Sequence, residues 1–227
     1  MKRLKTILRA GLIGAAIGVL VAKFVFHKEA HIADSLFDKS LIARWPWVCA
    51  VVGWVLFGLY WEISAKNAAA AKSAESGTSR GVHVFLANAA LILEIIPLRW
   101  SSRFVPASSL ITAAGIAVEA MGLVLAILAR RHLGRNWSGE ISIKVDHELI
   151  RSGPYQLLRH PIYTGLLTMY AGTALVTGTW LAIAGFAIAV FAYVRKIRLE
   201  EVNLQVAFGA EYETYRRESW ALVPGLF

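Results

Sequence analysis

Long apolar stretches constrain this chain more than any other feature. Six windows approach or exceed the roughly 20 apolar residues that a helix needs to cross a bilayer, at about Ile7–Phe26, Trp47–Ile63, Val82–Leu98, Ser109–Ala129, Pro161–Thr177 and Trp180–Val194. In lipid, backbone N–H and C=O groups must form hydrogen bonds with each other inside the segment, which favours helices. Because 57% of the residues are hydrophobic and 17% charged, the sequence predicts an all-α integral membrane protein with about six transmembrane helices.

Lysine and arginine residues fall unevenly between the loops. With six spans, 18 of the 24 basic residues lie on the side of the two termini and six lie on the other. Such an excess is typical of cytoplasmic loops. We therefore expect an inner-membrane or plasma-membrane protein with cytoplasmic ends, whose first apolar stretch is retained as an anchor rather than cleaved as a signal peptide.

The net charge of +9 has the same explanation. Basic residues beside apolar spans do not form the soluble basic face of a nucleic-acid-binding protein, so no nucleic acid partner is expected. Cys49 is the only cysteine, which rules out an intrachain disulfide. The histidines of the second half lack the spacing of metal ligands, so no metal is expected either.

The chain divides into two parts at residue 130. Residues 1–129 hold four predicted transmembrane helices. Residues 130–227 form a predicted catalytic module with a cytoplasmic loop, a helical hairpin and a C-terminal helical segment. Thr177-Gly178-Thr179 is the expected tight turn of the hairpin. Beyond Val194 the pattern becomes amphipathic, which predicts a cytoplasmic helix broken near Gly209 that lies on the membrane or caps the site.

Two charged clusters flank the predicted hairpin. Arg159 and His160 precede Pro161, which suits the first turn of a helix, and Glu200-Glu201 begins 35 residues after Gly165. That distance lets the chain cross a bilayer and return, so both clusters should reach one membrane face and form a polar site there. Gly165 lets a ligand or a neighbouring backbone approach closely. The alternative is a pair of ordinary helix ends with solvated charges.

Several strings of the second half follow one known pattern. They are Leu133-Gly134-Arg135-Asn136-Trp137-Ser138, the stretch from His147 to Tyr155, the stretch from Arg159 to Gly165, Glu200-Glu201, and the tail with Phe208-Gly209, Tyr212 and Tyr215. Together they resemble the isoprenylcysteine carboxyl methyltransferase family over roughly Arg130–Phe227. The resemblance implies S-adenosylmethionine in a pocket at the cytoplasmic face. It also implies a lipophilic acceptor, a lipid or lipid-modified molecule, that enters from the bilayer.

The resemblance also implies cofactor-binding roles for the residues that match the motifs. The family's first cofactor strand falls on His147, Glu148, Leu149 and Ile150, its turn tyrosine on Tyr155, its helix-start contacts on His160, Pro161, Ile162 and Tyr163, and its acidic contact on Glu200.

The expected acceptor side departs from the family. Lys196 stands where the prenylcysteine enzymes carry an arginine that meets the acceptor carboxylate, and Arg198 is nearby. A lysine supplies a point charge without bidentate geometry. A carboxylate acceptor needs such a cation and no base, whereas an amine acceptor must be deprotonated, for which His160 or Glu201 would serve. We therefore expect Lys196, Arg198 and Glu201 to act on the acceptor, which is either a carboxylate of an isoprenylcysteine-like lipid or another lipid group.

Two other functions stay open. Sterol-reductase relatives have a similar tyrosine-rich tail, so a membrane reductase that uses NADPH is one alternative, and a non-catalytic membrane protein is the other. Glu94 and Glu119 lie within predicted spans, where carboxylates are functional candidates by default. We expect them to pair with serine, threonine or tryptophan donors between helices.

Overall fold

The computed structural model describes residues 45–65, 71–98, 101–137, 142–144 and 148–226. Its elements are α4 (Trp45–Ala65), β1 (Ala71–Ala74), α5 (Gly77–Ile95), α6 (Ser109–Leu133), η1 (Gly134–Asn136), β2 (Ser142–Lys144), η2 (Gly153–Gln156), α7 (Pro161–Thr177), α8 (Trp180–Phe208) and α9 (Ala210–Glu218). The predicted first span, Ile7–Phe26, lies outside the described residues.

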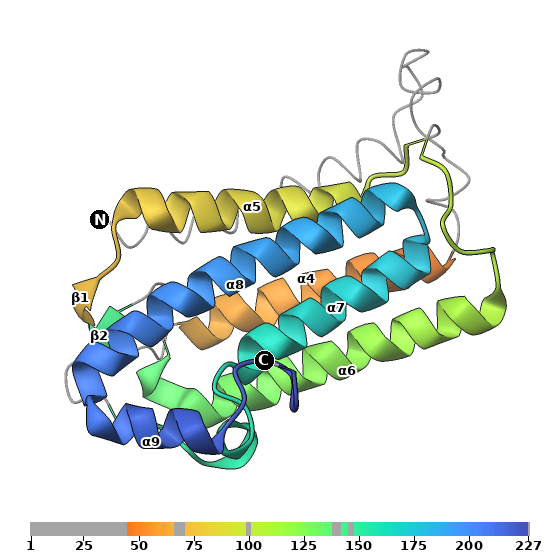
Figure 1. Ribbon diagram of the computed structural model, residues 1–227. Helices are drawn as coiled ribbons and strands as arrows, with labels where there is room; N and C mark the ends of the chain where they lie inside the picture. The colour runs from red at the N-terminus through yellow and green to blue at the C-terminus, as the bar shows by residue number, and fades with distance from the viewer. Residues whose placement is uncertain (1–44, 66–70, 99–100, 138–141, 145–147, 227) are drawn as a thin grey trace.

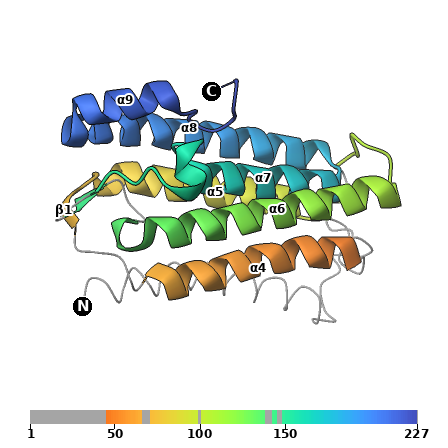
Figure 2. The same cartoon turned by 90° about the horizontal axis from the view of Figure 1, so that it is seen from below.

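In the described part of the chain, α4 to α8 form a bundle of helices that run side by side (Figures 1 and 2). They coincide with the second to sixth predicted spans. Three segments are long and apolar enough to cross a membrane, namely α4, Ser109–Asn136 and α8. Helix α7 has 17 residues, fewer than the roughly 20 of a full span. The part of the chain that the structure describes is thus mainly helical, as predicted, and three of its segments meet the requirements of a span.

Helices α6 and α7 approach closely because glycine faces glycine. A Cβ added at Gly122 would lie 2.5 Å from the carbonyl oxygen of Gly165, and one added at Gly172 would lie 2.6 Å from that of Gly115. Small residues at such crossings let two backbones touch, as in membrane helix pairs. The expected role of Gly165 is confirmed, and the neighbour it admits is the backbone of α6.

The turn between α7 and α8 makes these helices antiparallel. Gly178 adopts a left-handed conformation with φ of 64°, and its N–H donates to the carbonyl of Ala174. The Thr179 hydroxyl then accepts a hydrogen bond of 3.1 Å from the N–H of Ala182 and caps α8. The predicted turn is confirmed. Consequently the first residues of α7 and the last residues of α8 lie at the same end of the bundle (Figure 1).

Helix α8 continues beyond the sixth predicted span. It extends through Phe208 as one helix of 29 residues, and Lys196 and Ile197 beyond Val194 are buried. Most side chains of residues 198–207 are exposed, while Glu200, Asn203 and Leu204 border a cavity, so the helical segment expected after Val194 is the continuous end of α8. The predicted break at Gly209 is confirmed: α8 ends there, and α9 turns back along the bundle's end (Figure 1).

Candidate active site

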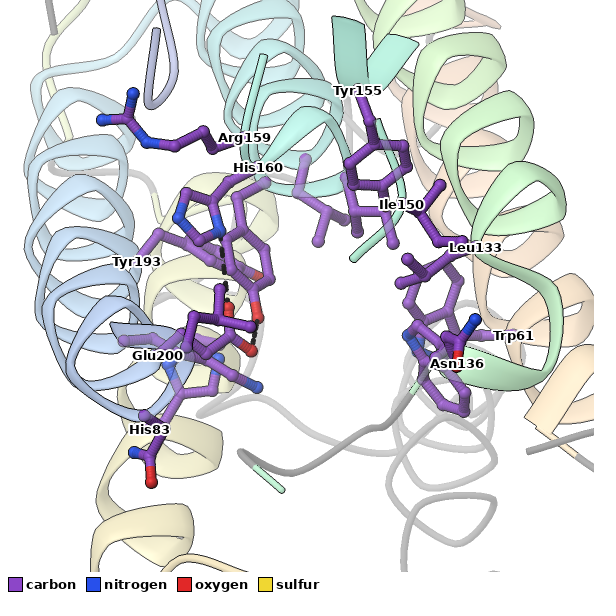
Figure 3. A pocket seen from close by; sticks show the side chains of 18 of the residues that line it. Trp61, His83, Leu133, Asn136, Ile150, Tyr155, Arg159, His160, Tyr193 and Glu200 are labelled. Carbon is purple, nitrogen blue, oxygen red and sulfur yellow. Dashed lines mark hydrogen bonds and ion pairs between the residues drawn. The ribbon is translucent and has the colours of Figure 1, made fainter. Parts of the chain in front are cut away.

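The C-terminal tail holds the start of α7. The backbone N–H groups of Arg159 and His160 donate to the carbonyls of Trp220 and Ala221, at 2.8 and 3.1 Å. His160 is the N-cap residue of α7, and its side chain makes no capping bond. Pro161 occupies the first turn, where its missing N–H costs nothing. The imidazole of His160 therefore points inward, where it is 6% exposed (Figure 3).

The imidazole of His160 lies between two carboxylates of α8. Its Nδ1 is 3.4 Å from Oε2 of Glu200, and its Nε2 is 3.4 Å from Oε1 of Glu201. The second contact is an ion-pair distance without hydrogen-bond alignment, because Nε2 has no hydrogen-bond partner. The ring also stacks on Tyr163, with centroids 5.6 Å apart and planes 11° apart. The two clusters predicted to meet at one end of the hairpin do meet.

Glu200 and Glu201 face different partners, as expected for neighbours on a helix. Oε1 of Glu200 accepts a hydrogen bond of 2.7 Å from the Tyr163 hydroxyl. Oε1 of Glu201 accepts one of 2.8 Å from Nε of Arg159, whose guanidinium also donates to the carbonyls of Arg216 and Ser219. Glu200 borders the interior cavity, whereas Glu201 joins α8 to α9 and the tail.

These surroundings shift the pKa of groups at this end of the bundle. Burial by itself would lower the pKa of His160, but the carboxylates of Glu200 and Glu201 outweigh burial, and the pKa is raised. Burial raises the pKa of Tyr155 far above its ordinary value, with a further contribution from Glu200. Burial also raises the pKa of Tyr215, to about 12. These shifts favour the protonated imidazole and the neutral form of both phenols.

A cavity of about 440 Å³ opens beside this cluster. Figure 3 shows His160, Tyr193, Glu200 and His83 on one wall and Tyr155, Ile150, Leu133, Asn136 and Trp61 on the other. This volume falls in the range of small-molecule sites, which are mostly apolar with a few fixed polar groups. Polar groups gather at the α7–α8 side, and the far wall is aromatic and aliphatic.

Most of the predicted site residues border this cavity. They are Glu148, Leu149, Ile150, Tyr155, His160, Ile162, Tyr163, Lys196 and Glu200. Three others do not: Pro161 is buried inside α7, Arg198 is exposed on the outer side of α8, and Glu201 binds Arg159. His147 lies outside the described residues.

The expected first cofactor strand is wrong as secondary structure. Residues 148–150 form no strand, and the strand that precedes them is β2, which pairs antiparallel with β1. Leu149 and Ile150 instead place their half-buried side chains along the cavity. A short run with a few apolar residues does not distinguish a strand from a loop segment that lines a cavity.

Sequence reasoning missed the contribution of α4, α5 and the middle of α8 to the cavity. Phe57 and Trp61 of α4, His83 and Asn88 of α5, and Tyr193 of α8 all border it. Aromatic residues in an apolar span resemble ordinary lipid-facing residues. His83 carried a usable signal, because a polar ring at the start of an apolar span is uncommon.

The two interior carboxylates differ. Oε2 of Glu119 accepts a hydrogen bond of 3.4 Å from the hydroxyl of Thr173, which itself accepts one of 2.9 Å from Nε1 of Trp54. The expected pairing is therefore confirmed for Glu119. It is wrong for Glu94, whose carboxyl oxygens are buried without a hydrogen-bond partner among the residues that the structure describes. Neither residue borders the large cavity.

Comparisons with known proteins find methyltransferases. Residues 110–211 match the family model of the phospholipid methyltransferases. A probable protein-S-isoprenylcysteine O-methyltransferase of Oryza sativa subsp. indica is 33% identical over 113 residues, which make up 48% of this chain and 59% of that protein. Methanethiol S-methyltransferase 2 of Bradyrhizobium diazoefficiens is 39% identical over 74 residues, 32% of this chain and 27% of that protein.

A solved structure of the eukaryotic intramembrane Ras methyltransferase, an isoprenylcysteine carboxyl methyltransferase, aligns with a TM-score of 0.47 and 20% identity, over 91% of this chain and 60% of that one. The chain spans less than two thirds of the length of each of these proteins. The range that matches the family model contains the motifs at the start of α7 and near the end of α8, where the polar cluster lies. Residues 110–211 are thus similar to the phospholipid methyltransferases, and the predicted resemblance to the isoprenylcysteine carboxyl methyltransferases is confirmed.

Proposed function

We propose that this protein is an integral membrane methyltransferase that transfers a methyl group from S-adenosylmethionine to a lipophilic acceptor. One observation carries the proposal. His160, Tyr163 and Glu200, from two motifs of the matched region, meet at the wall of a cavity of about 440 Å³ inside a bundle with membrane-spanning helices. The cavity is large enough for a nucleoside-sized ligand.

The residues around the cavity fit S-adenosylmethionine. A carboxylate can accept about four hydrogen bonds, so Glu200 can contact Tyr163 and His160 and still accept one from a ribose hydroxyl or an ammonium group. Glu148 adds a second carboxylate, and Tyr155 and Trp61 add aromatic faces for an adenine ring or a cation. When bound, this cofactor would supply an electrophilic methyl group on a sulfonium. The chain's own residues would hold it and exclude water.

Lys196 is the proposed acceptor-side cation. It is 7% exposed, borders the cavity, and places Nζ 5.7 Å from the ring centroid of Tyr163. Its charge would attract an anionic acceptor or stabilise one that becomes anionic. The names of the relatives include both an O-methyltransferase and an S-methyltransferase, which supports more than one class of acceptor in this family. Arg198 and Glu201 lie outside the cavity and take no part in this proposal.

The apolar wall of the cavity supports a lipophilic acceptor that arrives from the bilayer. Phe57 and Trp61 of α4 border the cavity from a helix whose other face is exposed and apolar. We propose the inner or plasma membrane as the location, with the site and both ends of the chain at the cytoplasmic face, because basic residues concentrate in the loops on that side.

Ligand-dependent stability tests the proposed function. The detergent-purified protein is heated with S-adenosylhomocysteine, with NADPH and with neither. A ligand at 100 times its dissociation constant stabilises a fold by about 2.7 kcal/mol. We expect a higher melting temperature with S-adenosylhomocysteine alone. Stabilisation by NADPH alone would support the reductase alternative, and stabilisation by neither would support a non-catalytic membrane protein.

A further inference from the structure

His83 is a histidine of the cavity that lies outside the matched region. It stands in the second turn of α5, is 9% exposed, and borders the cavity on the same wall as Glu200 (Figure 3). Its ring packs edge-on against Tyr193, with centroids 5.1 Å apart. The family model begins at residue 110, so this side chain is a feature of the chain's first half.

The hydrogen bond of His83 fixes which ring nitrogen carries the proton. Nδ1 lies 3.3 Å from the carbonyl oxygen of Ala192 on α8. A carbonyl can only accept, so Nδ1 must be the protonated nitrogen. In the neutral ring Nε2 then holds a lone pair. His83 makes no hydrogen bond other than the one to Ala192 among the residues that the structure describes. It is therefore oriented as a base.

Lys196 and Glu200 are the charged groups that act on His83 across the cavity, together with Glu75 before α5. Lys196 lies one helical turn beyond Ala192, the residue that holds the ring. Burial first, and then the ammonium of Lys196, disfavour a positive charge on the imidazole, and the ammonium favours an anion in the cavity that both residues border. A neutral base and a cation that share one cavity can convert a weakly acidic group into an anion.

Three kinds of acceptor group that carry a removable proton can be compared on this chemistry. A thiol has an ordinary pKa of about 8.5, the lowest of the three, and a nearby ammonium lowers that value further. An alcohol is a much weaker acid. An amine arrives as a cation, which Lys196 repels. The thiol therefore fits this pair of side chains best, and the apolar wall with Phe57 and Trp61 fits a lipophilic one.

Resting on the proposed function, we infer that His83 is the general base for a lipophilic thiol acceptor, with Lys196 stabilising the thiolate. The S–H proton passes to Nε2 of His83. The acceptor sulfur then forms a bond to the methyl carbon as the bond from that carbon to the sulfonium breaks, and the electron pair of the broken bond stays on the departing sulfur as a neutral thioether. His83 returns its proton to water. A carboxylate acceptor would need no such base.

Two acceptors of equal chain length test the inference, namely 1-octanethiol and octanoate, each with S-adenosylmethionine labelled in its methyl group. We compare the wild type with His83→Asn, whose amide can keep the donor to Ala192 but offers no base. His132→Asn is the matched control, because His132 is exposed and outside the cavity. Binding of S-adenosylhomocysteine by thermal shift and the ultraviolet absorbance of bound thiolate are measured for all three.

We expect the wild type and His132→Asn to methylate 1-octanethiol and to show bound thiolate. His83→Asn should lose about 10²- to 10⁴-fold in rate, as when a general base is removed, lose the thiolate signal, and keep the thermal shift with S-adenosylhomocysteine.

Two results overturn the inference while leaving the proposed function intact. One is methylation of octanoate but not of 1-octanethiol by the wild type, which needs no variant. The other is an unchanged thiol rate in His83→Asn. Absence of S-adenosylhomocysteine binding to the wild type contradicts the proposed function, and the inference falls with it.

Discussion

The hydroxyl of Tyr163 donates a hydrogen bond of 2.7 Å to Glu200, although 37 residues separate the two in sequence. Tyr163 stands in the first turn of α7 and Glu200 near the end of α8, so the bond joins the two ends of the helical hairpin. It also orients a carboxylate beside the cavity. The proposed cofactor site depends on this junction.

Replacing Glu200 by glutamine tests the role of its charge. The variant keeps the shape of the side chain but removes the anion that Tyr163 and His160 hold in place. Because a hydrogen bond to a charged group is worth about 1.5–3 kcal/mol, we expect S-adenosylhomocysteine to bind about 10- to 150-fold more weakly in calorimetric titration. The control is Glu213→Gln on the exposed face of α9. If both variants bound S-adenosylhomocysteine with equal affinity, Glu200 would have no part in cofactor binding.

The close packing of α6 and α7 predicts that Gly122→Ala destabilises the protein. The new methyl group would meet the Gly165 carbonyl at 2.5 Å, so the helices must separate. Overpacking of this kind costs about 1–3 kcal/mol, which should lower the melting temperature by several degrees. Gly81→Ala on α5 is the control, since no atom lies within 4 Å of its added Cβ. If both variants melt like the wild type, the helices do not approach as described.

The raised pKa of His160 predicts how its contribution to stability varies with pH. Folding favours the protonated ring, so the contribution is complete below about pH 6.5, the ordinary pKa of histidine, and is lost as pH rises through the higher pKa of the folded state. The difference in melting temperature between the wild type and His160→Gln should therefore shrink with rising pH. A difference that grows with pH would mean that the folded protein holds this ring neutral.

The two interior carboxylates predict opposite effects of the same substitution. Glu94 is buried without a hydrogen-bond partner among the described residues, so Glu94→Met should leave the melting temperature unchanged or raise it. Glu119 receives a hydrogen bond from Thr173, so Glu119→Met should cost about 1–3 kcal/mol. Thermal unfolding in one detergent compares them directly. The reverse order would show that Glu94 has a partner in the membrane.

The strongest local signals were read correctly from sequence. The bounds of α7 agree with the predicted fifth span, because Pro161 begins a helix well and Gly178 ends one well. The meeting of His160 with Glu200 followed from the length of chain between their clusters. These predictions used local chemistry and distance along the chain, both of which a single sequence contains.

Other features depend on packing, which a single sequence does not reveal. The amphipathic pattern after Val194 indicates a helix but not whether it packs into the bundle, as α8 does. The wall of α4 and α5 is made of residues such as Trp61 and His83, whose neighbours come from distant parts of the chain. The cavity therefore draws on residues from both sides of residue 130.

Calorimetric titration of the detergent-purified protein with S-adenosylhomocysteine tests the proposed methyl-donor site without an acceptor. We expect saturable binding at one site per chain, reduced by Glu200→Gln and absent with NADPH. No heat of binding with S-adenosylhomocysteine, under conditions where the protein remains folded, would contradict a methyl-donor site between the start of α7 and the end of α8.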